Sequence, residues 1–367
     1  AYADVQSYLS GVPDYFWYHG CSPTSGGMLI GYWDNRPGFG NLYAETAPMF
    51  AGPGYQAIDE VISSTEHNTG PYNPTECTHS NAPPAGDLGP NSLACFMHTD
   101  PLTGGTWDWN MPTGLRRYAS YDDPDTSVNE SLAFHSFIYY SSWATWPQYW
   151  NAPAFSFRDL MREIDAGRPL LMNLSLEGGG HSVVAYGYWL RDDGSRWFAV
   201  RDTWQDGITE GMYGVAAIGD HGQEWWPWEE HQAGEEFGYA YFVDDVVFFV
   251  PDLRGPIMAS GTFEQPYAID HHIATVRGNL SATGEEDWYM IYLGVGESVV
   301  ATTQDNEGDT SSIDTQILLV DPTLSQGWIY DGFWAGGANT DYAMRQADRE
   351  GWWRVGVRGA NPAQTGD

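Results

Sequence analysis

The sequence contains no lysine, and its 15 basic residues, all arginine, are outnumbered by 49 aspartates and glutamates. The formal net charge of −34 repels the phosphates of nucleic acids and the head groups of anionic lipids. We therefore expect neither nucleic acid nor anionic lipid as a partner. The excess of carboxylates suits solubility outside the cell and the binding of cations such as calcium.

Long apolar runs are also missing, since no stretch approaches the roughly 20 residues of a membrane-spanning helix. We therefore predict no membrane span. Charged residues make up only 17% of the chain and hydrophobic residues 42%, a composition unlike that of a disordered acidic tail. The 367 residues are enough for two domains.

Cysteine is scarce, with three residues in all. Cys77 and Cys95 lie 18 residues apart in a segment rich in proline, glycine and asparagine. We predict a disulfide between them, which would contribute about 3 kcal/mol of stability and would imply an oxidising compartment. Two reduced, buried thiols are the alternative. No CxxC or HExxH spacing indicates a zinc site.

Helical spacing of apolar residues predicts a helix over residues 22–34, with Pro23 in its first turn, and a second over 156–168, which Ser156 and Asp159 begin as a capping box. Weaker helical patterns occur near 55–64 and 128–140. Strands are predicted at 169–175, 182–190, 197–202, 212–218 and 239–250. This order predicts an α+β domain with an antiparallel sheet over residues 1–250.

A short segment, 251–256, contains two prolines and is predicted to be a linker. Beyond it, alternating strands at 287–293, 297–302, 314–320 and 352–357 predict a small all-β sandwich over residues 257–367.

Three residues that suit nucleophilic catalysis occur in compatible local contexts. Cys21 stands at the start of the first predicted helix, where the helix dipole and a neighbouring imidazolium would stabilise a thiolate. His181 opens one predicted strand and Asp202 closes the next, so antiparallel pairing would bring them together and let Asp202 orient the imidazole. Trp204 would shield the pair from water. Taken singly, a lone cysteine is more often a small buried hydrophobic residue.

Three segments around these residues resemble those of a known family. Residues 20–24, Gly-Cys-Ser-Pro-Thr, resemble the nucleophile segment of papain-like cysteine peptidases, and the bacteriocin-leader-peptidase-like branch is the most similar. Residues 180–188 resemble the histidine strand of that branch, and residues 201–204, Arg-Asp-Thr-Trp, resemble its third-member segment. The resemblance covers residues 10–250 and implies a papain-like peptidase fold with a Cys-His-Asp triad.

One feature of that family is absent, because the glutamine that usually precedes the nucleophile as an oxyanion donor is not found. Tyr15, Trp17 and His19 are the candidates to donate in its place, beside the backbone N–H of Cys21. Loss of such a donor typically costs about 10²–10³ in rate.

The tail resembles bacterial pre-peptidase C-terminal domains, which accompany secreted hydrolases. The similarity lies in residues 284–296, 314–320 and 351–357. It implies a secreted, extracellular protein of bacterial type.

An acidic turn in the tail brings several oxygen ligands together at Asp305, Glu307 and Asp309. These residues form a candidate calcium site, although they lack the full EF-hand pattern and a solvated turn is the alternative. No cofactor is required for the predicted catalysis.

These observations predict a secreted cysteine peptidase that acts on a peptide or protein substrate. The alternative is an extracellular structural protein, a filament, tube or surface lattice, that assembles from copies of itself on an inactive peptidase fold. The missing glutamine and the aromatic content of 15% motivate that alternative.

Overall fold

The computed structural model divides the chain into two compact units. Residues 1–146 and 154–251 form the first unit, and residues 147–153 and 252–367 form the second. The main boundary thus falls after Pro251, at the start of the predicted linker. The structure describes residues 4–39, 42–43, 46–52, 55, 58, 61–63, 92–120, 134–140, 155–176, 179–203, 216–217, 224–228, 241–251, 261–269, 284–303, 315–325, 327–331 and 342–359.

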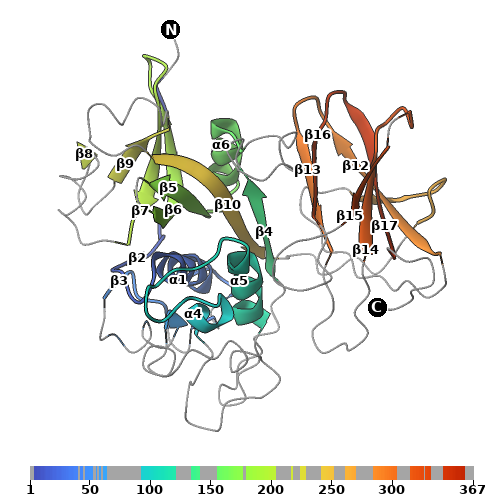
Figure 1. Cartoon of the computed structure of the whole chain (residues 1–367). Coiled ribbons are helices and arrows are strands. Elements are labelled where there is room, and N and C mark those ends of the chain that lie inside the picture. The colour runs from blue at the N-terminus through green and yellow to red at the C-terminus, as the bar shows by residue number, and fades with distance from the viewer. Residues whose placement is uncertain are drawn as a thin grey trace, which may run out of the picture. The chain divides into compact units, whose positions relative to one another are not determined.

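The first unit combines helices with an antiparallel sheet, as the α+β prediction expects (Figure 1). Its described helices are α1 (Cys21–Asp34), α4 (Leu93–Phe96), α5 (Asn110–Ser120) and α6 (Phe157–Asp165). The strands of its main sheet are β1 (Val5–Tyr8), β4 (Phe134–Tyr140), β5 (Leu170–Leu176), β6 (Gly179–Leu190), β7 (Arg196–Arg201), β8 (Ala216–Ala217), β9 (Glu224–Pro227) and β10 (Tyr241–Pro251). A separate pair joins β2 (Asp14–Tyr15) to β3 (Phe50–Ala51).

The main sheet has the strand order β4-β10-β5-β6-β7-β9-β8 among the described residues, and β1 pairs with β6. Helix α1 contacts β5 and β6, while α5 contacts β4 and β10, and both helices contact α4. Figure 1 shows α1, α4 and α5 grouped beside the sheet. These contacts place α1 and α5 against neighbouring strands of the sheet.

Helix α1 lies in the interior of the unit, because every residue after Cys21 is buried. Its glycines give low intrinsic helix propensity, so tertiary packing has to stabilise it. Gly31 explains the close packing, since an added Cβ there would lie 2.7 Å from the hydroxyl oxygen of Tyr15. The helix predicted over 22–34 is confirmed.

Helix α6 begins as its sequence predicts. The hydroxyl of Ser156 accepts from the N–H of Asp159 at 3.3 Å, and the Asp159 carboxylate accepts from the N–H of Ser156 at 2.9 Å. This reciprocal capping box satisfies two otherwise unpaired donors at the helix start.

The helix indicated near 128–140 is wrong for Phe134–Tyr140, which forms strand β4 at the edge of the sheet. The segment Phe-His-Ser-Phe-Ile-Tyr-Tyr is rich in aromatic residues, which favour strands. It pairs with β10 from Pro251↔Phe134 to Asp245↔Tyr140, and this long-range pairing overrides local periodicity.

The second unit contains strands only, as far as it is described. A five-stranded sheet has the order β11 (Tyr267–Ile269), β12 (Glu286–Leu293), β17 (Gly351–Gly359), β14 (Thr315–Val320) and β15 (Gly327–Asp331). A second, two-stranded sheet pairs β13 (Ser298–Thr302) with β16 (Tyr342–Gln346). No helix of the described ranges, in either unit, is long and apolar enough to cross a membrane.

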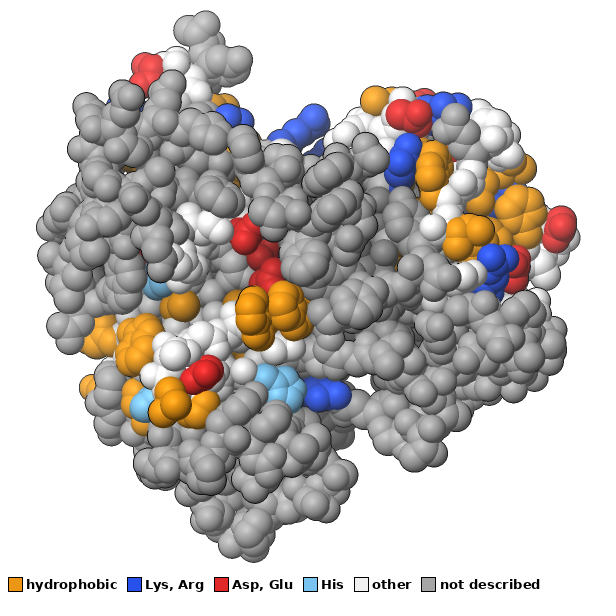
Figure 2. Space-filling model, viewed as in Figure 1, with side chains coloured by type: hydrophobic (Ala, Val, Ile, Leu, Met, Phe, Trp, Pro, Cys, Tyr) orange, Lys and Arg blue, Asp and Glu red, His pale blue; other side chains and the backbone are white. Residues whose placement is uncertain are grey.

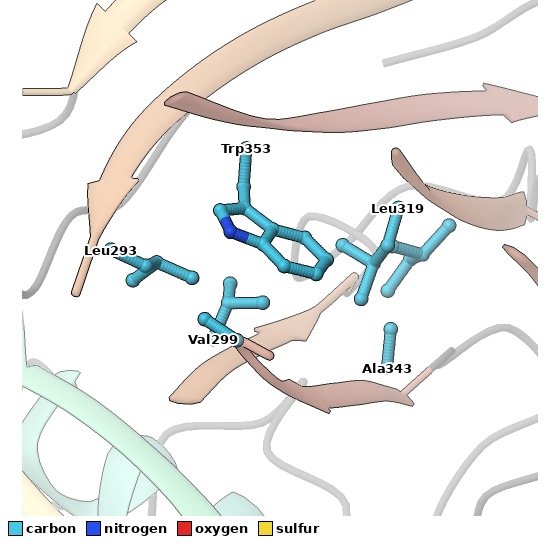
Figure 3. Packing of buried hydrophobic residues seen from close by; sticks show 7 residues of the cluster. Leu293, Val299, Leu319, Ala343 and Trp353 are labelled. Atoms are coloured by element: carbon cyan, nitrogen blue, oxygen red, sulfur yellow. The ribbon is translucent and has the colours of Figure 1, made fainter. Parts of the chain in front are cut away.

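Side chains from both sheets of the second unit form one hydrophobic core (Figure 3). Its buried members are Leu293, Val299, Ile317, Leu319, Ala343, Ala347 and Trp353. Because two sheets share this core, the described part of the tail has the layered packing that a β-sandwich requires.

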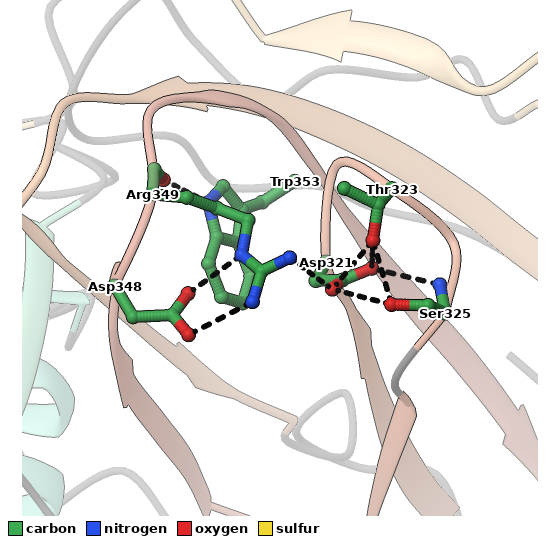
Figure 4. A network of polar contacts seen from close by, with 6 residues as sticks. All are labelled: Asp321, Thr323, Ser325, Asp348, Arg349 and Trp353. Atoms are coloured by element: carbon green, nitrogen blue, oxygen red, sulfur yellow. Dashed lines mark hydrogen bonds and ion pairs between the residues drawn. The ribbon is translucent and has the colours of Figure 1, made fainter.

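A buried carboxylate stabilises a turn at the edge of this core (Figure 4). Asp321, only 1% exposed, accepts from the N–H of Ser325 at 3.0 Å and from the Thr323 hydroxyl at 2.9 Å. Arg349 lies 3.5 Å from the same carboxylate. The carbonyl oxygen of Arg349 accepts from the indole N–H of Trp353 at 3.3 Å, which connects the turn to the core.

Replacing this carboxylate should destabilise the second unit. We expect Asp321→Ala to lower the free energy of unfolding by about 1.5–3 kcal/mol, because the N–H of Ser325, the Thr323 hydroxyl and Arg349 lose their bonds to a charged acceptor. Urea denaturation followed by tryptophan fluorescence measures the change. The control is Asp348→Ala, which removes an exposed partner of Arg349 and should leave stability nearly unchanged. Equal losses in the two variants would contradict the role given to Asp321.

Candidate active site

The start of α1 is held in place by the side chain of Thr24. Its hydroxyl donates to the carbonyl oxygen of Gly20 at 2.6 Å and accepts from the N–H of Tyr18 at 3.1 Å. Gly20 is the N-cap, with φ of +140°, and an added Cβ there would lie 2.8 Å from the carbonyl oxygen of Gly104. Glycine is therefore required at position 20, and Cys21 occupies the first position of the helix, where backbone N–H groups have no partner within the helix.

Two serines dock this end of α1 onto strand β6. The hydroxyls of Ser22 and Ser182 lie 2.8 Å apart, and the Ser25 hydroxyl donates to the carbonyl oxygen of Ser182 at 2.9 Å. His181 precedes Ser182 in β6, so the docking brings Cys21 and His181 together.

Cys21 is a free thiol, half-buried, and hydrogen-bonded to the ring of His181. Burial raises its pKa, but the hydrogen bond to His181, the positive charge of that ring, and hydrogen bonds from Ser182 and Ser22 outweigh burial. Together they lower the pKa of Cys21 from its ordinary value of 9.0 to about 7. The thiolate is therefore a major form of this side chain near neutral pH.

His181 is 5% exposed, and its ring is the hydrogen-bond partner of Cys21. Burial lowers its pKa, yet the hydrogen bond to Cys21 and the charges of Cys21 and Asp202 raise it above its ordinary value of 6.5. Both shifts favour an imidazolium beside a thiolate, the arrangement that activates a cysteine nucleophile.

Asp202 lies beside His181, but the hydrogen bond differs from the one predicted. Nε2 of His181 lies 2.8 Å from the main-chain carbonyl oxygen of Asp202. Because a carbonyl oxygen only accepts, Nε2 carries the hydrogen and Nδ1 is left to face Cys21. The backbone at Asp202 therefore orients the ring, and its carboxylate acts through its charge.

The three candidate oxyanion donors lie in different places. The hydroxyl of Tyr15 lies next to Gly31, ten residues after Cys21 and thus about 15 Å farther along the helix. The prediction for Tyr15 is corrected accordingly: its fully buried ring packs against the middle of α1, and burial raises the pKa of its hydroxyl.

Trp17 and His19 lie closer to Cys21. An added Cβ at Gly104 would lie 3.2 Å from the Cα of Gly20 and 3.3 Å from the Trp17 ring, which places that indole beside the N-cap of α1. The Trp17 and His19 ring centroids are 6.2 Å apart. The N–H of Trp17 also donates to the carbonyl oxygen of Thr203 at 2.5 Å, so the segment before Cys21 is joined to the segment after Asp202.

Several predicted site residues fall outside the described ranges. They are Trp204, Cys77 and the candidate calcium ligands Asp305, Glu307 and Asp309. Cys95 is described and fully buried, but its predicted bridge to Cys77 stays a prediction. In the described part of the chain, no three His, Cys, Asp or Glu side chains lie close enough together to hold a metal ion.

A buried polar row behind the cysteine was missed by sequence reasoning. The Ser182 hydroxyl donates to the side-chain oxygen of Asn173 at 2.6 Å, and the Asn173 amide donates to Asp245 at 2.7 Å. The available signal was the occurrence of polar residues inside apolar strands, Asn173 in β5 and the pair Asp244-Asp245 in β10. The row connects the docked end of α1 to the neighbouring strands.

We expect His181→Gln to suppress the reactivity of Cys21. With the ring removed, burial dominates and raises the thiol pKa from about 7 toward or beyond 9, so iodoacetamide alkylation at pH 6 should slow by about 100-fold. Mass spectrometry of the peptide that carries Cys21 measures the rate. His98→Gln changes a histidine outside this pair and is the control. Unchanged alkylation in His181→Gln would show that the thiol ionises without the imidazole.

We expect Asp202→Asn to keep the ring of His181 in place, because the backbone carbonyl of residue 202 is retained. Loss of the carboxylate charge should lower the pKa of His181, so the imidazolium should lose its proton at a lower pH than in the unmodified chain. NMR titration of the His181 ring measures this midpoint. Asp193→Asn, in the exposed turn after β6, is the charge-matched control. An unchanged midpoint would contradict the electrostatic role of Asp202.

Comparison with known proteins does not assign the chain to a family. No protein-family model matches it, and no curated protein matches it. The chemistry proposed for the chain therefore depends on the contacts of Cys21 and His181.

Proposed function

We propose that the chain is a secreted cysteine peptidase, with Cys21 as the nucleophile and His181 as the general acid and base. The observation that carries this proposal is the hydrogen-bonded pair of Cys21 and His181, in which the thiol pKa is lowered to about 7 in spite of burial. A buried cysteine without such a partner would have a raised pKa and little nucleophilic character.

The proposed reaction proceeds in two halves. The Cys21 sulfur attacks the carbonyl carbon of a peptide bond, and the His181 imidazolium gives its proton to the departing amine as the carbon–nitrogen bond breaks. Water then attacks the resulting thioester while His181 removes one of its protons. The carbon–sulfur bond breaks, the carboxylic acid leaves, and the thiolate–imidazolium pair is restored.

The oxyanion formed in each half would lie at the start of α1. The backbone N–H of Cys21 is a donor there, and the positive end of the helix dipole favours negative charge. The Trp17 indole N–H and the His19 ring are the side-chain donors that this proposal retains, because both lie in the segment leading to Gly20.

We interpret the first unit as a papain-like peptidase domain and the second as a pre-peptidase C-terminal-like sandwich. The excess of carboxylates and the predicted bridge between Cys77 and Cys95 fit an extracellular location.

A structural role in an assembly of identical chains is the second candidate. The observation that favours it is the exposed aromatic pair on the five-stranded sheet of the second unit, Tyr292 on β12 and Trp352 on β17. Their rings are 48% and 45% exposed, and aromatic side chains of this kind often anchor protein interfaces.

Hydrolysis of a mixed peptide library, followed by mass spectrometry, tests the proposed function. We expect Cys21→Ala to reduce the rate by at least about 10³-fold, because the nucleophile is lost. Hydrolysis by the unmodified chain should fall as the pH drops below about 7, because the thiolate becomes protonated. Asp193→Asn, in the exposed turn at the opposite end of β6 from His181, should retain the rate.

Persistent hydrolysis in Cys21→Ala would overturn the proposed function. An unmodified chain that cleaves none of the peptides and sediments as a large assembly would favour the structural role instead.

A further inference from the structure

Three carboxyl groups gather between α5 and the sheet of the first unit. Asp244 and Asp245 stand side by side on β10, where the pairing with β5 shifts register between Val243 and Asp245. Asp244 is 3.3 Å from the Ser175 hydroxyl, and Asp245 accepts from Asn173 at 2.7 Å. Both partners, Ser175 and Asn173, lie on β5, so the two carboxyls lie over the same strand.

The third carboxyl comes from the segment that leads into α5. Met111, in the first turn of α5, has its sulfur 3.3 Å from the Asn173 amide, which brings the helix start over β5. Asp108 lies three residues earlier and accepts from the N–H of Trp109 at 2.9 Å. Asp108 and Asp244 are half-buried, while Asp245 is fully buried beneath them.

These carboxyls act on one another without a neutralising cation among the described residues. Burial and the charge of Asp244 raise the pKa of Asp108 to about 6. Burial and the charges of Asp108 and Asp244 also raise the pKa of Asp245. No described arginine is among the groups that shift these pKa values, and Oδ2 of Asp245 has no hydrogen-bond partner in the described part of the chain.

A stacked pair of tryptophans flanks Asp108. The rings of Trp107 and Trp109 lie 4.6 Å apart at an interplanar angle of 9°, and Trp107 is 63% exposed. Figure 2 shows acidic side chains gathered over β10 with hydrophobic side chains next to them at the start of α5. Carboxylates beside an indole face are the combination that binds a guanidinium, through paired hydrogen bonds and stacking.

This cluster is at a fixed distance from the proposed reactive pair. Asp245 on β10 pairs with Asn173 on β5, and Asn173 pairs with Ser182 on β6, the residue next to His181, so the cluster lies two strands from the reactive pair. Two strand spacings make about 10 Å. Since an extended peptide advances about 3.3 Å per residue, this spacing corresponds to about three residues of an extended substrate.

We propose that Asp108, Asp244 and Asp245, with the Trp107–Trp109 pair, form a subsite for an arginine or lysine side chain of the substrate, about three residues from the cleaved bond. This inference rests on the proposed peptidase function for its meaning. The site itself can be tested without any hydrolysis.

Binding to the Cys21→Ala variant, which cannot form the thioester, tests the subsite. The probes are fluorescent peptides that carry arginine at each position in turn, matched with peptides that carry citrulline, the uncharged isostere. We expect at least one arginine peptide to bind about tenfold more tightly than its citrulline match. Asp108→Asn and Asp244→Asn should each remove most of this preference, and Trp107→Leu should reduce it. Asp193→Asn, the same charge change in an exposed turn, should leave the preference intact.

Equal binding of arginine and citrulline peptides by folded protein would overturn the subsite. So would binding of calcium alone that depends on Asp108 and Asp244 while the peptide pairs bind alike, because the cluster would then be a metal site. An arginine preference in Cys21→Ala, together with no hydrolysis by the unmodified chain, would overturn the proposed function and leave the subsite standing. Hydrolysis by the unmodified chain with no preference for arginine peptides would overturn the subsite and leave the proposed function standing.

Discussion

Burial of Cys21 opposes its own ionisation, and the proposed chemistry depends on the histidine that overcomes this opposition. In isolation, the partly desolvated thiol would hold its proton near neutral pH. The ring of His181 reverses the balance by accepting a positive charge next to the sulfur, and Ser182 and Ser22 add hydrogen bonds to the same sulfur. The charge of Asp202 in turn favours the protonated ring. Each member of the pair therefore has neighbours that favour its charged form against the effect of burial.

The fold provides this arrangement by fixing one helix end against one strand. Gly20 allows the backbone turn and the close approach of Gly104, and Thr24 holds the residues before it. Ser22 and Ser25 then join α1 to β6 at Ser182. Behind these contacts the polar row extends through β5 to β10, where the carboxyls of the proposed subsite lie. The same hydrogen bonds that position the nucleophile thus connect it to the region that would select its substrate.

Local sequence patterns predicted the elements whose geometry is local. The helix that begins at Cys21, the Ser156 capping box and the strand that contains His181 all follow from spacing and from capping chemistry. The juxtaposition of Cys21 and His181 followed from the combination of these contexts.

Features that depend on distant partners were not predictable in the same way. Residues 134–140 look weakly helical alone and become a strand because β10 lies beside them. Tyr15 precedes Cys21 by six residues in the sequence, yet its ring packs against the middle of α1. The atom of Asp202 that contacts His181 depends on the path of the backbone after β7, which no side-chain pattern reveals. Asp108 lies far from Asp244 and Asp245 in the sequence, so only the tertiary structure shows that the three carboxyl groups form a cluster.

Measuring the pKa of the Cys21 thiol in the intact, folded chain tests the proposed chemistry most directly. Ultraviolet absorbance of the thiolate, recorded across pH as the difference between the unmodified chain and Cys21→Ser, isolates this one sulfur. We predict a transition centred near pH 7. A transition at pH 9 or above would mean that His181 does not stabilise the thiolate, and it would contradict the proposed chemistry.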